Sequence, residues 1–436
     1  MNQGTHAESN IRKVALTSLA GTSIEWYDFF LYGAAAGLVF PKLFFGDASP
    51  TTALILSFLT FAAGFIARPV GGIIFGHFGD LIGRKKTLVI ALMLMGISST
   101  LIGLLPTYAT IGVAAPILLT LLRFAQGIAI GGQWGGAMLL VTESAPKEKR
   151  GYYGAFAQAG APIGVILANL AFIGVGLFTN EESFLAWGWR IPFLASFVLI
   201  IISLYIQLRL EDTEAFKELE SLKEQNPNED IVIKSSPILE AIRKYPKRIS
   251  LAAGAFLSVQ VTFYILIAFL LAYGVETTDL NRDDLLMAVL IGSAIMVPTQ
   301  FYFSAYSDRN GRKGIFMAGA ALTAVWAFAI FPLMASGSFI LAVLAIAVGL
   351  TFLGMMYGPQ AAFFAELFST EVRYSGASLG YQLGAIIGGS FAPIIATLLW
   401  KNYDIFWVSV YIAFASTLSL ISVYMLTETF QKDLND

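Results

Sequence analysis

The chain of 436 residues is 57% hydrophobic and only 13% charged, with a mean hydropathy of +0.72. A soluble domain carries about 25% charged residues, so this composition excludes an ordinary soluble protein and indicates one whose solvent is the lipid bilayer. The net charge of −2 argues against nucleic-acid binding, the lack of cysteine excludes disulfides and thiolate metal sites, and the two histidines lie too far apart in sequence to suggest a metal centre.

Twelve apolar segments follow one another along the chain, each long enough to cross a bilayer as a helix. Such a span needs about 20 mostly apolar residues. The predicted spans are 14–40, 52–76, 87–106, 111–142, 151–178, 188–209, 248–274, 285–306, 314–335, 338–366, 373–400 and 404–427. The first contains Glu25 and Asp28 and exceeds the ~7–15 residues of a signal-peptide core, so we expect it to be retained as a span.

A long polar stretch, 210–247, separates the first six spans from the last six. Its charged residues recur at helix-compatible spacing before a turn near Pro227, and we interpret it as a solvated connector. The predicted organisation is therefore an N-terminal half of residues 1–209, the connector, and a C-terminal half of residues 248–436.

Lysine and arginine are concentrated in the loops on one side of the predicted spans. With the N-terminus inside, that side holds Arg12, Lys13, Arg84, Lys85, Lys86, Lys147, Lys149, Arg150, the basic residues of the connector, Arg309, Arg312, Lys313, Arg373 and Lys432. The other side holds acidic residues and only four basic ones, Lys42, Arg190, Arg282 and Lys401. Because cytoplasmic loops are the basic ones, both termini are predicted to be cytoplasmic.

Two charged patterns occur twice, at corresponding places in the two sets of spans. The loops after the second and eighth spans share residue types and spacing: Asp80, Gly83, Arg84 and Lys85, then Asp308, Gly311, Arg312 and Lys313. The fourth and tenth spans each end in a glutamate and an arginine seven residues apart: Glu143 with Arg150, and Glu366 with Arg373. The duplication predicts two similar six-helix halves that face each other.

These loops and several other segments resemble the major facilitator superfamily. Within it, the chain is similar to the metabolite:proton symporter family, which includes bacterial shikimate, oxoglutarate, citrate and proline/betaine carriers. The segments that carry the resemblance are 79–86, 123–127 and 307–313 for the superfamily, and 25–33, 67–72, 131–136 and 187–193 for the narrower family. Leu81 stands where the superfamily pattern has an arginine, which the second copy keeps as Arg309.

The resemblance implies an all-α integral membrane protein of the major facilitator fold in a bacterial inner membrane. It also implies alternating access driven by a proton gradient, with no cofactor. It does not identify the substrate.

Two carboxylates in the first span, Glu25 and Asp28, are candidates for carrying protons. They are three residues apart and therefore lie on one face of the helix. A charge inside a bilayer costs about 2.5–3.5 kcal/mol on insertion scales, and two neighbouring carboxylates cannot both ionise cheaply. One is thus expected to hold a proton that it can release on the other side. The alternative is that one of them simply pairs with a buried arginine.

Arg68 in the second span and Arg123 in the fourth are candidates for binding an anionic substrate. A guanidinium stays charged, and its planar fork matches a carboxylate. Alternatively, both are structural counter-ions of Glu25 and Asp28. The two interpretations are compatible if substrate and carboxylate compete for one arginine. Protonation of Asp28 would then free Arg123 for substrate and couple the two movements.

Polar and aromatic side chains near the middle of the predicted spans suggest a cavity between the halves. Amides in lipid must find hydrogen-bond partners and therefore face inward, toward either a substrate or a neighbouring helix. The predicted substrate-binding residues besides the two arginines are Tyr32, Gln126, Gln133, Trp134, Gln260, Tyr264, Gln360, Tyr381 and Gln382.

The repeated charged loops are predicted to act as gates. Asp80 is expected to pair with Arg150, and Asp308 and Arg373 would form the equivalent pair in the second half. Such pairs would form when the cytoplasmic side closes and break when it opens. The alternative for the basic members is that they only fix topology. The full gating set is Asp80, Arg84, Glu143, Arg150, Asp308, Arg312, Glu366 and Arg373.

The predicted function is proton-coupled import of a small polar metabolite, and the two arginines favour one with a carboxylate. A zwitterion of the betaine or proline type would also fit, with its cationic end over aromatic rings. Proton-coupled export of amphiphilic drugs is a further alternative and predicts a wide apolar cavity. No nucleophile–base or metal constellation supports an enzyme. The expected partners are the substrate, protons and lipid, with the transporter acting as a monomer.

Overall fold

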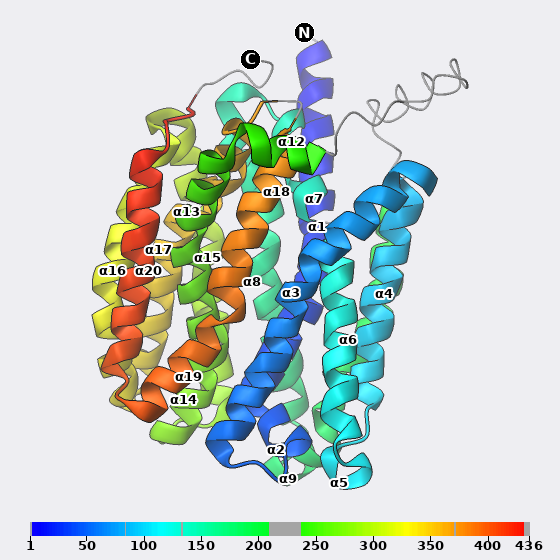
Figure 1. The fold of residues 1–436 in the computed structure, drawn as a ribbon, viewed down its shortest axis with the longest axis vertical. Helices are drawn as coiled ribbons and strands as arrows, with labels where there is room; N and C mark the ends of the chain where they lie inside the picture. Colours follow the sequence, from blue (N-terminus) through cyan, green and yellow to red (C-terminus); the bar gives the residue numbers. More distant parts are fainter. Residues whose placement is uncertain (1, 83, 132–133, 209–236, 370–371, 431–436) are drawn as a thin grey trace.

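The computed structural model describes residues 2–82, 84–131, 134–208, 237–369 and 372–430 (Figure 1). Within these ranges the chain is helical and contains no strand. The long helices run side by side, and the first and last described residues lie at the same end of the bundle, which we call the terminal end. The short helices α2 (Phe40–Phe44), α5 (Tyr108–Ile111) and α9 (Glu181–Ser183) lie at the opposite end, the far end.

Six long helical segments make up the N-terminal half. They are α1 (Asn2–Leu38), α3 (Pro50–Ile82), α4 (Arg84–Leu104), α6 (Ala114–Gly131) followed by α7 (Trp134–Ser144), α8 (Arg150–Gly176) and α10 (Arg190–Leu208). The fourth span, predicted as one segment from 111 to 142, is thus described as two helices, and residues 132–133 between them lie outside the described part. The sixth begins with a π-helical turn, Phe184–Gly188, and the chain bends by 46° before α10.

The C-terminal half contains six further segments, preceded by the short α12 (Pro237–Lys244). They are α13 (Pro246–Tyr264) with α14 (Leu270–Thr277), α15 (Arg282–Asn310), α16 (Arg312–Ala335), α17 (Phe339–Glu366), α18 (Arg373–Gly384) with α19 (Ala392–Asn402), and α20 (Phe406–Met425). Most of the predicted connector, residues 209–236, lies outside the described part.

The described helices confirm the prediction of an all-α membrane protein. Nine of them are long and apolar enough to cross a membrane, and the bent pair Glu181–Gly188 and Arg190–Ile202 makes a tenth. α4 adds a shorter apolar stretch, Val89–Leu104, and α1 completes the set with Glu25 and Asp28 in its apolar part. The arrangement agrees with twelve spans in two sets of six.

α3 and α6 cross at a distance that requires glycine. A Cβ atom added to Gly71 would lie 1.9 Å from the carbonyl oxygen of Ile128, and one added to Gly131 would lie 1.9 Å from that of Arg68. Small residues allow helix backbones to approach this closely in a membrane. The contact holds Arg68 of α3 and Arg123 of α6 in the interior of the same half, where both are buried.

Side-chain amides join the two halves along α8, α15 and α17. Three of them donate to backbone carbonyls of the opposite half: Asn169 to Leu286 at 3.0 Å, Gln158 to Tyr357 at 3.1 Å, and Gln300 to Ala155 at 3.2 Å. At the far end, Glu181 of α9 forms an ion pair with Arg282 of α15 at 2.9 Å. The halves are therefore in contact through the middle of the bundle and at its far end.

Candidate functional site

Arg68 is buried among aromatic rings with most of its hydrogen-bonding capacity unused. Its side chain is 1% exposed, and its guanidinium carbon lies 4.4 Å from the ring centroids of both Phe29 and Phe65 and 5.3 Å from that of Trp26. None of its three nitrogens makes a hydrogen bond of good geometry within the described part of the chain, although the Tyr264 hydroxyl lies close enough to interact with the guanidinium. Because a buried charge with incomplete hydrogen bonding is costly, this guanidinium is suited to a ligand that supplies further acceptors.

Arg123 lies against the same rings but is partly satisfied. Its guanidinium carbon is 3.9 Å from the centroid of Phe29 and 4.4 Å from that of Tyr32. One nitrogen, Nη1, donates to Gln126 Oε1 at 3.0 Å, whereas Nε and Nη2 have no partner among the described residues. Phe29 thus contacts both cations. The alternative in which a carboxylate of the first span pairs with a buried arginine does not apply to Asp28, which makes no ion pair with Arg68 or Arg123 within the described part.

The C-terminal half presents tyrosines to Arg68. The ring of Tyr264 lies 5.0 Å from that of Phe65, and the charge of Arg68 interacts with the hydroxyl groups of Tyr264, Tyr357 and Tyr381. Buried amide atoms of the same half also have no hydrogen-bond partner in the described ranges: Gln260 Oε1, Gln382 Oε1 and both amide atoms of Gln360. The structure therefore brings the predicted residues Arg68, Tyr264 and Tyr381 together across the interface between the halves.

Two other predicted substrate-binding residues support the site from within the N-terminal half. The Tyr32 hydroxyl donates to Thr60 Oγ1 at 2.7 Å, and Gln126 Nε2 donates to Ser99 Oγ at 2.6 Å. Their polar groups are therefore already bonded to protein. Gln133 and the side chain of Trp134 lie outside the described residues.

Asp28 is buried and linked indirectly to Arg123. Its side chain is 1% exposed, Oδ1 accepts a hydrogen bond from the hydroxyl of Ser196 on α10, and Oδ2 has no partner among the described residues. Ser99 on α4 also interacts with this carboxylate. Since Gln126 binds Ser99 and Arg123 binds Gln126, a chain of polar side chains connects the acid to the cation.

Ser99 and Ser196 are functional candidates that the sequence interpretation missed. Serines in spans commonly bond to a carbonyl of their own helix, so neither residue differs from its neighbours at the level of sequence. Glu25, although three residues from Asp28, has different surroundings. It lines a small pocket of about 10 Å³ with Thr22 and Ile130. The two carboxylates therefore do not form a joint site.

π-helical turns lie next to the C-terminal site residues. Ile265–Phe269 directly follows Tyr264, and Ala385–Ser390 begins three residues after Gln382. A π turn adds a residue to the helical repeat, turns the side chains that follow, and is frequent at functional sites. Both helices therefore carry a local break at the depth of the candidate site.

A buried charged cluster joins the halves at the terminal end. Glu366 at the end of α17, with 0% of its side chain exposed, pairs with Arg150 of α8 at 3.2 Å and with Arg312 of α16 at 3.1 Å. Arg312 also pairs with Asp308 at 2.6 Å. We call these four residues the first latch. The Arg150–Glu366 pair crosses from the N-terminal to the C-terminal half.

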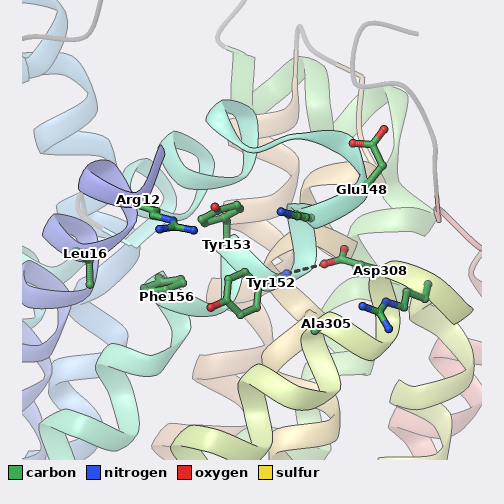
Figure 2. A pocket seen from close by; sticks show the side chains of 10 residues that line it. Arg12, Leu16, Glu148, Tyr152, Tyr153, Phe156, Ala305 and Asp308 are labelled. Carbon is green, nitrogen blue, oxygen red and sulfur yellow. Dashed lines mark hydrogen bonds between the residues drawn. The ribbon is translucent and has the colours of Figure 1, made fainter. Parts of the chain in front are cut away.

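The carboxylate of Asp308 makes a second crossing contact (Figure 2). Its two oxygens accept hydrogen bonds from the backbone N–H groups of Gly151 at 2.7 Å and Tyr152 at 2.8 Å. These groups belong to the first turn of α8, where N–H groups have no partner inside the helix. The end of α15 thus caps the start of α8.

The second latch is an ion pair between Arg373 of α18 and Glu143 of α7 at 3.1 Å. It also crosses between the halves. Its carboxylate is 48% exposed, in contrast to the fully buried Glu366. The two latches therefore have similar lengths but very different surroundings.

The predicted pairing of Asp308 with Arg373 is wrong, because Asp308 binds Arg312 and the start of α8. The pairing of Arg150 with Asp80 stays a prediction, because the side chain of Asp80 lies outside the described residues; within the described part Arg150 forms an ion pair with Glu366. The Asp308 prediction fails because the two halves face each other, which sets the arginine of each half against the glutamate of the other. The side chains of Asp80 and Arg84 lie outside the described residues.

The segment after α20 supports the first latch. The carboxylate of Glu428 accepts hydrogen bonds from the backbone N–H groups of Arg312 at 3.0 Å and Lys313 at 2.9 Å, which caps the start of α16. The hydroxyl of Thr429 donates to Glu366 Oε2 at 2.7 Å. The C-terminal segment is therefore bound to the charged cluster on the side of the C-terminal half.

Comparison with known proteins identifies several relatives that match nearly the whole chain. It is 41% identical to the inner membrane metabolite transport protein YhjE of Escherichia coli (strain K12), over 97% of this chain and 95% of that protein. It is 37% identical to the shikimate transporter of the same strain, over 98% and 97%. It is 31% identical to the proline/betaine transporter of Salmonella typhimurium (strain LT2), over 98% and 85%.

The fold is also that of a solved transporter. The structure of the proton:xylose symporter XylE of E. coli superposes with a TM-score of 0.72 and 18% identity over 98% of each chain. The model of the Major Facilitator Superfamily matches residues 18–378 of the sequence. Together with the helical halves described above, these similarities show that the chain is a multi-pass membrane transporter that belongs to the Major Facilitator Superfamily.

Proposed function

We propose that the protein imports a small carboxylate-bearing metabolite together with a proton. The observation that carries the proposal is Arg68, a 1% exposed guanidinium that lies against three aromatic rings, with only the Tyr264 hydroxyl near it and no hydrogen bond of good geometry on any nitrogen in the described ranges. A substrate carboxylate would supply two acceptors in the geometry that a guanidinium prefers. The similarity to a shikimate transporter supports a carboxylate substrate.

A zwitterionic substrate is the second candidate, supported by the similarity to a proline/betaine transporter. Its carboxylate would bind Arg68 in the same way, but its cationic end would need an aromatic face. The rings of Phe29 and Phe65 already lie against guanidinium groups. The cationic end would therefore depend on Tyr264 and Tyr381 in the C-terminal half.

Asp28 is the proposed proton carrier. An ionised carboxylate is costly in a buried place where one oxygen has no partner, whereas the protonated acid brings its own donor. Asp28 and Arg123 also interact electrostatically. Protonation would remove this attraction and leave Arg123 to the substrate anion, so that proton and substrate would bind together. Glu25, in its own small pocket, is the second candidate for carrying a proton.

The latches are the proposed gates of alternating access. Opening the terminal end requires the Arg150–Glu366 and Arg373–Glu143 pairs to break, and opening the far end requires the Glu181–Arg282 pair to break. We place the terminal end in the cytoplasm because the basic loop residues are concentrated there. The similarity to an inner membrane protein supports a bacterial inner membrane location.

The experiment measures binding and accumulation separately. Purified protein is screened by thermal shift against organic acids, betaines and amphiphilic cations, and ligands that stabilise it are tested for uptake into proteoliposomes with an inside-alkaline pH gradient. Asp28→Asn is expected to bind the acid but not to accumulate it. Arg68→Gln is expected to lose binding itself. Arg243→Gln, an exposed change of the same kind, serves as the control.

Two results would contradict the proposal. Gradient-driven accumulation by Asp28→Asn at the wild-type level would exclude Asp28 as the proton carrier. Stabilisation by amphiphilic cations alone would exclude the carboxylate substrate and favour a drug exporter. Stabilisation by betaines rather than by acids would select the zwitterionic candidate.

A further inference from the structure

A second site lies at the terminal end, away from the buried arginines. A pocket of about 710 Å³ lies between α1, the start of α8 and the end of α15 (Figure 2). Pockets for small molecules have volumes of roughly 300–1,000 Å³. Figure 2 shows Arg12 and Leu16 on α1 across the pocket from Tyr153 and Phe156 on α8.

Each of the three helices lines this pocket with a charged residue on the outside and an uncharged residue further in. Each places a basic residue nearest the terminal end and an uncharged residue about one turn deeper in the bundle. The pairs are Arg12 with Leu16 on α1, Lys149 with Tyr153 at the start of α8, and Arg309 with Ala305 on α15. A ligand that matches all three helices has an anionic end at the terminal side and an apolar end below it.

The charge of the pocket is positive. Arg12, Lys149 and Arg309 line it together with two acids, Glu148 and Asp308. The carboxylate of Asp308 is already bound by Arg312 and two backbone N–H groups. Among the described lining residues, three are basic, and Glu148 is the acid that the first latch does not use.

Aromatic side chains place this pocket at the depth of a membrane surface. Tyr152, Tyr302 and Tyr306 are 37%, 66% and 44% exposed near the ends of α8 and α15. Exposed tyrosines gather where the hydrocarbon meets the headgroups. Phe156 continues the apolar lining inward and packs edge-to-face against Phe301 of α15, with the ring centroids 4.8 Å apart.

We propose that this pocket binds an anionic phospholipid, with its phosphate among Arg12, Lys149 and Arg309 and its acyl chains along Leu16 and Phe156. Basic pockets between membrane helices on the cytoplasmic side bind such headgroups. A soluble anion would use the cations but not the apolar lining below them. The order of polarity on all three helices therefore favours the lipid.

A lipid bound here would connect the two halves. Arg12 and Lys149 belong to the N-terminal half and Arg309 to the C-terminal half. The Asp308–Tyr152 contact, which also crosses between the halves, lies in the same wall. The bound headgroup is therefore expected to stabilise the closed terminal end.

Native mass spectrometry of the full-length protein tests the binding. The probes are dioleoylphosphatidylglycerol, dioleoylphosphatidylcholine with the same acyl chains, and free glycerol phosphate. The wild type is expected to retain the anionic lipid in preference to the zwitterionic one. The double variant Arg12→Gln/Arg309→Gln is expected to retain it about 25-fold less, at about fivefold for each basic residue removed.

A matched control and a rescue complete the experiment. Arg243→Gln/Lys247→Gln removes two exposed cations from the same end but outside the pocket, and is expected to retain the lipid like the wild type. Arg12→Lys/Arg309→Lys keeps the charge and is expected to restore retention, which separates charge loss from misfolding. Equal retention by the pocket and control variants would overturn the proposal. Displacement of the lipid by equimolar glycerol phosphate would overturn the lipid assignment.

Discussion

Replacing Glu366 by glutamine is expected to open the terminal end, whereas the same replacement at Glu143 is expected to have little effect. The two carboxylates occupy corresponding positions and form ion pairs of similar length, 3.2 Å with Arg150 and 3.1 Å with Arg373. Their exposure differs, since 0% of the Glu366 side chain and 48% of the Glu143 side chain reach solvent. Burial, not distance, decides which latch is the stronger.

The magnitude follows from the charges that remain. Among the described residues, Glu366 is the carboxylate that Arg150 and Arg312 share, so Glu366→Gln removes a buried negative charge that two arginines contact. Breaking a buried pair in this way costs about 3–5 kcal/mol, and opening relieves the cost because water then reaches the cluster. In the second latch Arg373 is 4% exposed, but its acid partner is half-exposed and its Nε also donates to the Ala365 carbonyl at 3.0 Å. We therefore assign this pair the roughly 0.2–1 kcal/mol of an exposed ion pair. At about 1.4 kcal/mol per tenfold, the open fraction rises by at least about 100-fold for Glu366→Gln and at most about fivefold for Glu143→Gln.

A single introduced cysteine can report the opening, because the chain has none of its own. Ala361 on α17 is fully buried and faces α8, where a Cβ added to Gly154 would lie 3.3 Å from its methyl group. With excess soluble maleimide, the rate of alkylation of Ala361→Cys is proportional to the open fraction. The same reporter is measured in the Glu366→Gln and Glu143→Gln backgrounds.

Global unfolding is excluded by a second reporter, Ala320→Cys, which is buried within the C-terminal half. Its alkylation rate is expected to stay constant in both backgrounds. Equal acceleration of the Ala361→Cys reaction by the two glutamine variants would refute the argument from burial. No acceleration by Glu366→Gln would refute the role of the first latch as a gate.

Three further predictions concern single positions. Thr429→Val removes the hydroxyl that binds Glu366 and is expected to lower the free energy of unfolding by about 1.5–3 kcal/mol. The open fraction is expected to stay the same, because both partners belong to the C-terminal half. Faster Ala361→Cys alkylation in this variant would contradict the prediction. Arg68→Lys keeps the charge but loses the planar fork, so the affinity for an acid substrate measured by thermal shift is expected to fall at least about tenfold; unchanged affinity would remove Arg68 from the site. Gly131→Ala puts a methyl group 1.9 Å from a backbone oxygen and is expected to destabilise the fold by about 1–3 kcal/mol. Gly174→Ala is the control, because its new methyl group would have no atom within 4 Å. Equal melting temperatures of the two variants would show that α3 and α6 separate freely.

Hydropathy and charge were sufficient to predict the number and class of the spans, because lipid requires long apolar helices and the repeated loops mark their order. The π turns could not be predicted in this way. Ile265–Phe269 and Ala385–Ser390 lie inside spans that are uniformly apolar, and a single extra residue in a helical turn does not alter the hydropathy of a window. Packing between helices decides where such turns form.

The residue types of the site were predictable, but their partners were not. Buried arginines and acids stand out in an apolar span, and Arg68, Arg123 and Asp28 are all buried as expected. The equal spacing of glutamate and arginine in each half, however, does not say whether the pairs form within a half or between halves. Ser196, the partner of Asp28, lies 168 residues away and carries an ordinary hydroxyl, so only the packed structure identifies it.

The two ion pairs between the halves follow the pattern that two identical subunits form about a two-fold axis. In an isologous dimer, if residue i of one subunit meets residue j of the other, then j also meets i. Here Arg150 meets Glu366 while Glu143 meets Arg373. Within a single polypeptide, these two contacts thus follow the pattern of an isologous interface. A change on one side of this interface has a structural counterpart on the other, and the difference in burial between Glu366 and Glu143 shows that the two counterparts are not equivalent.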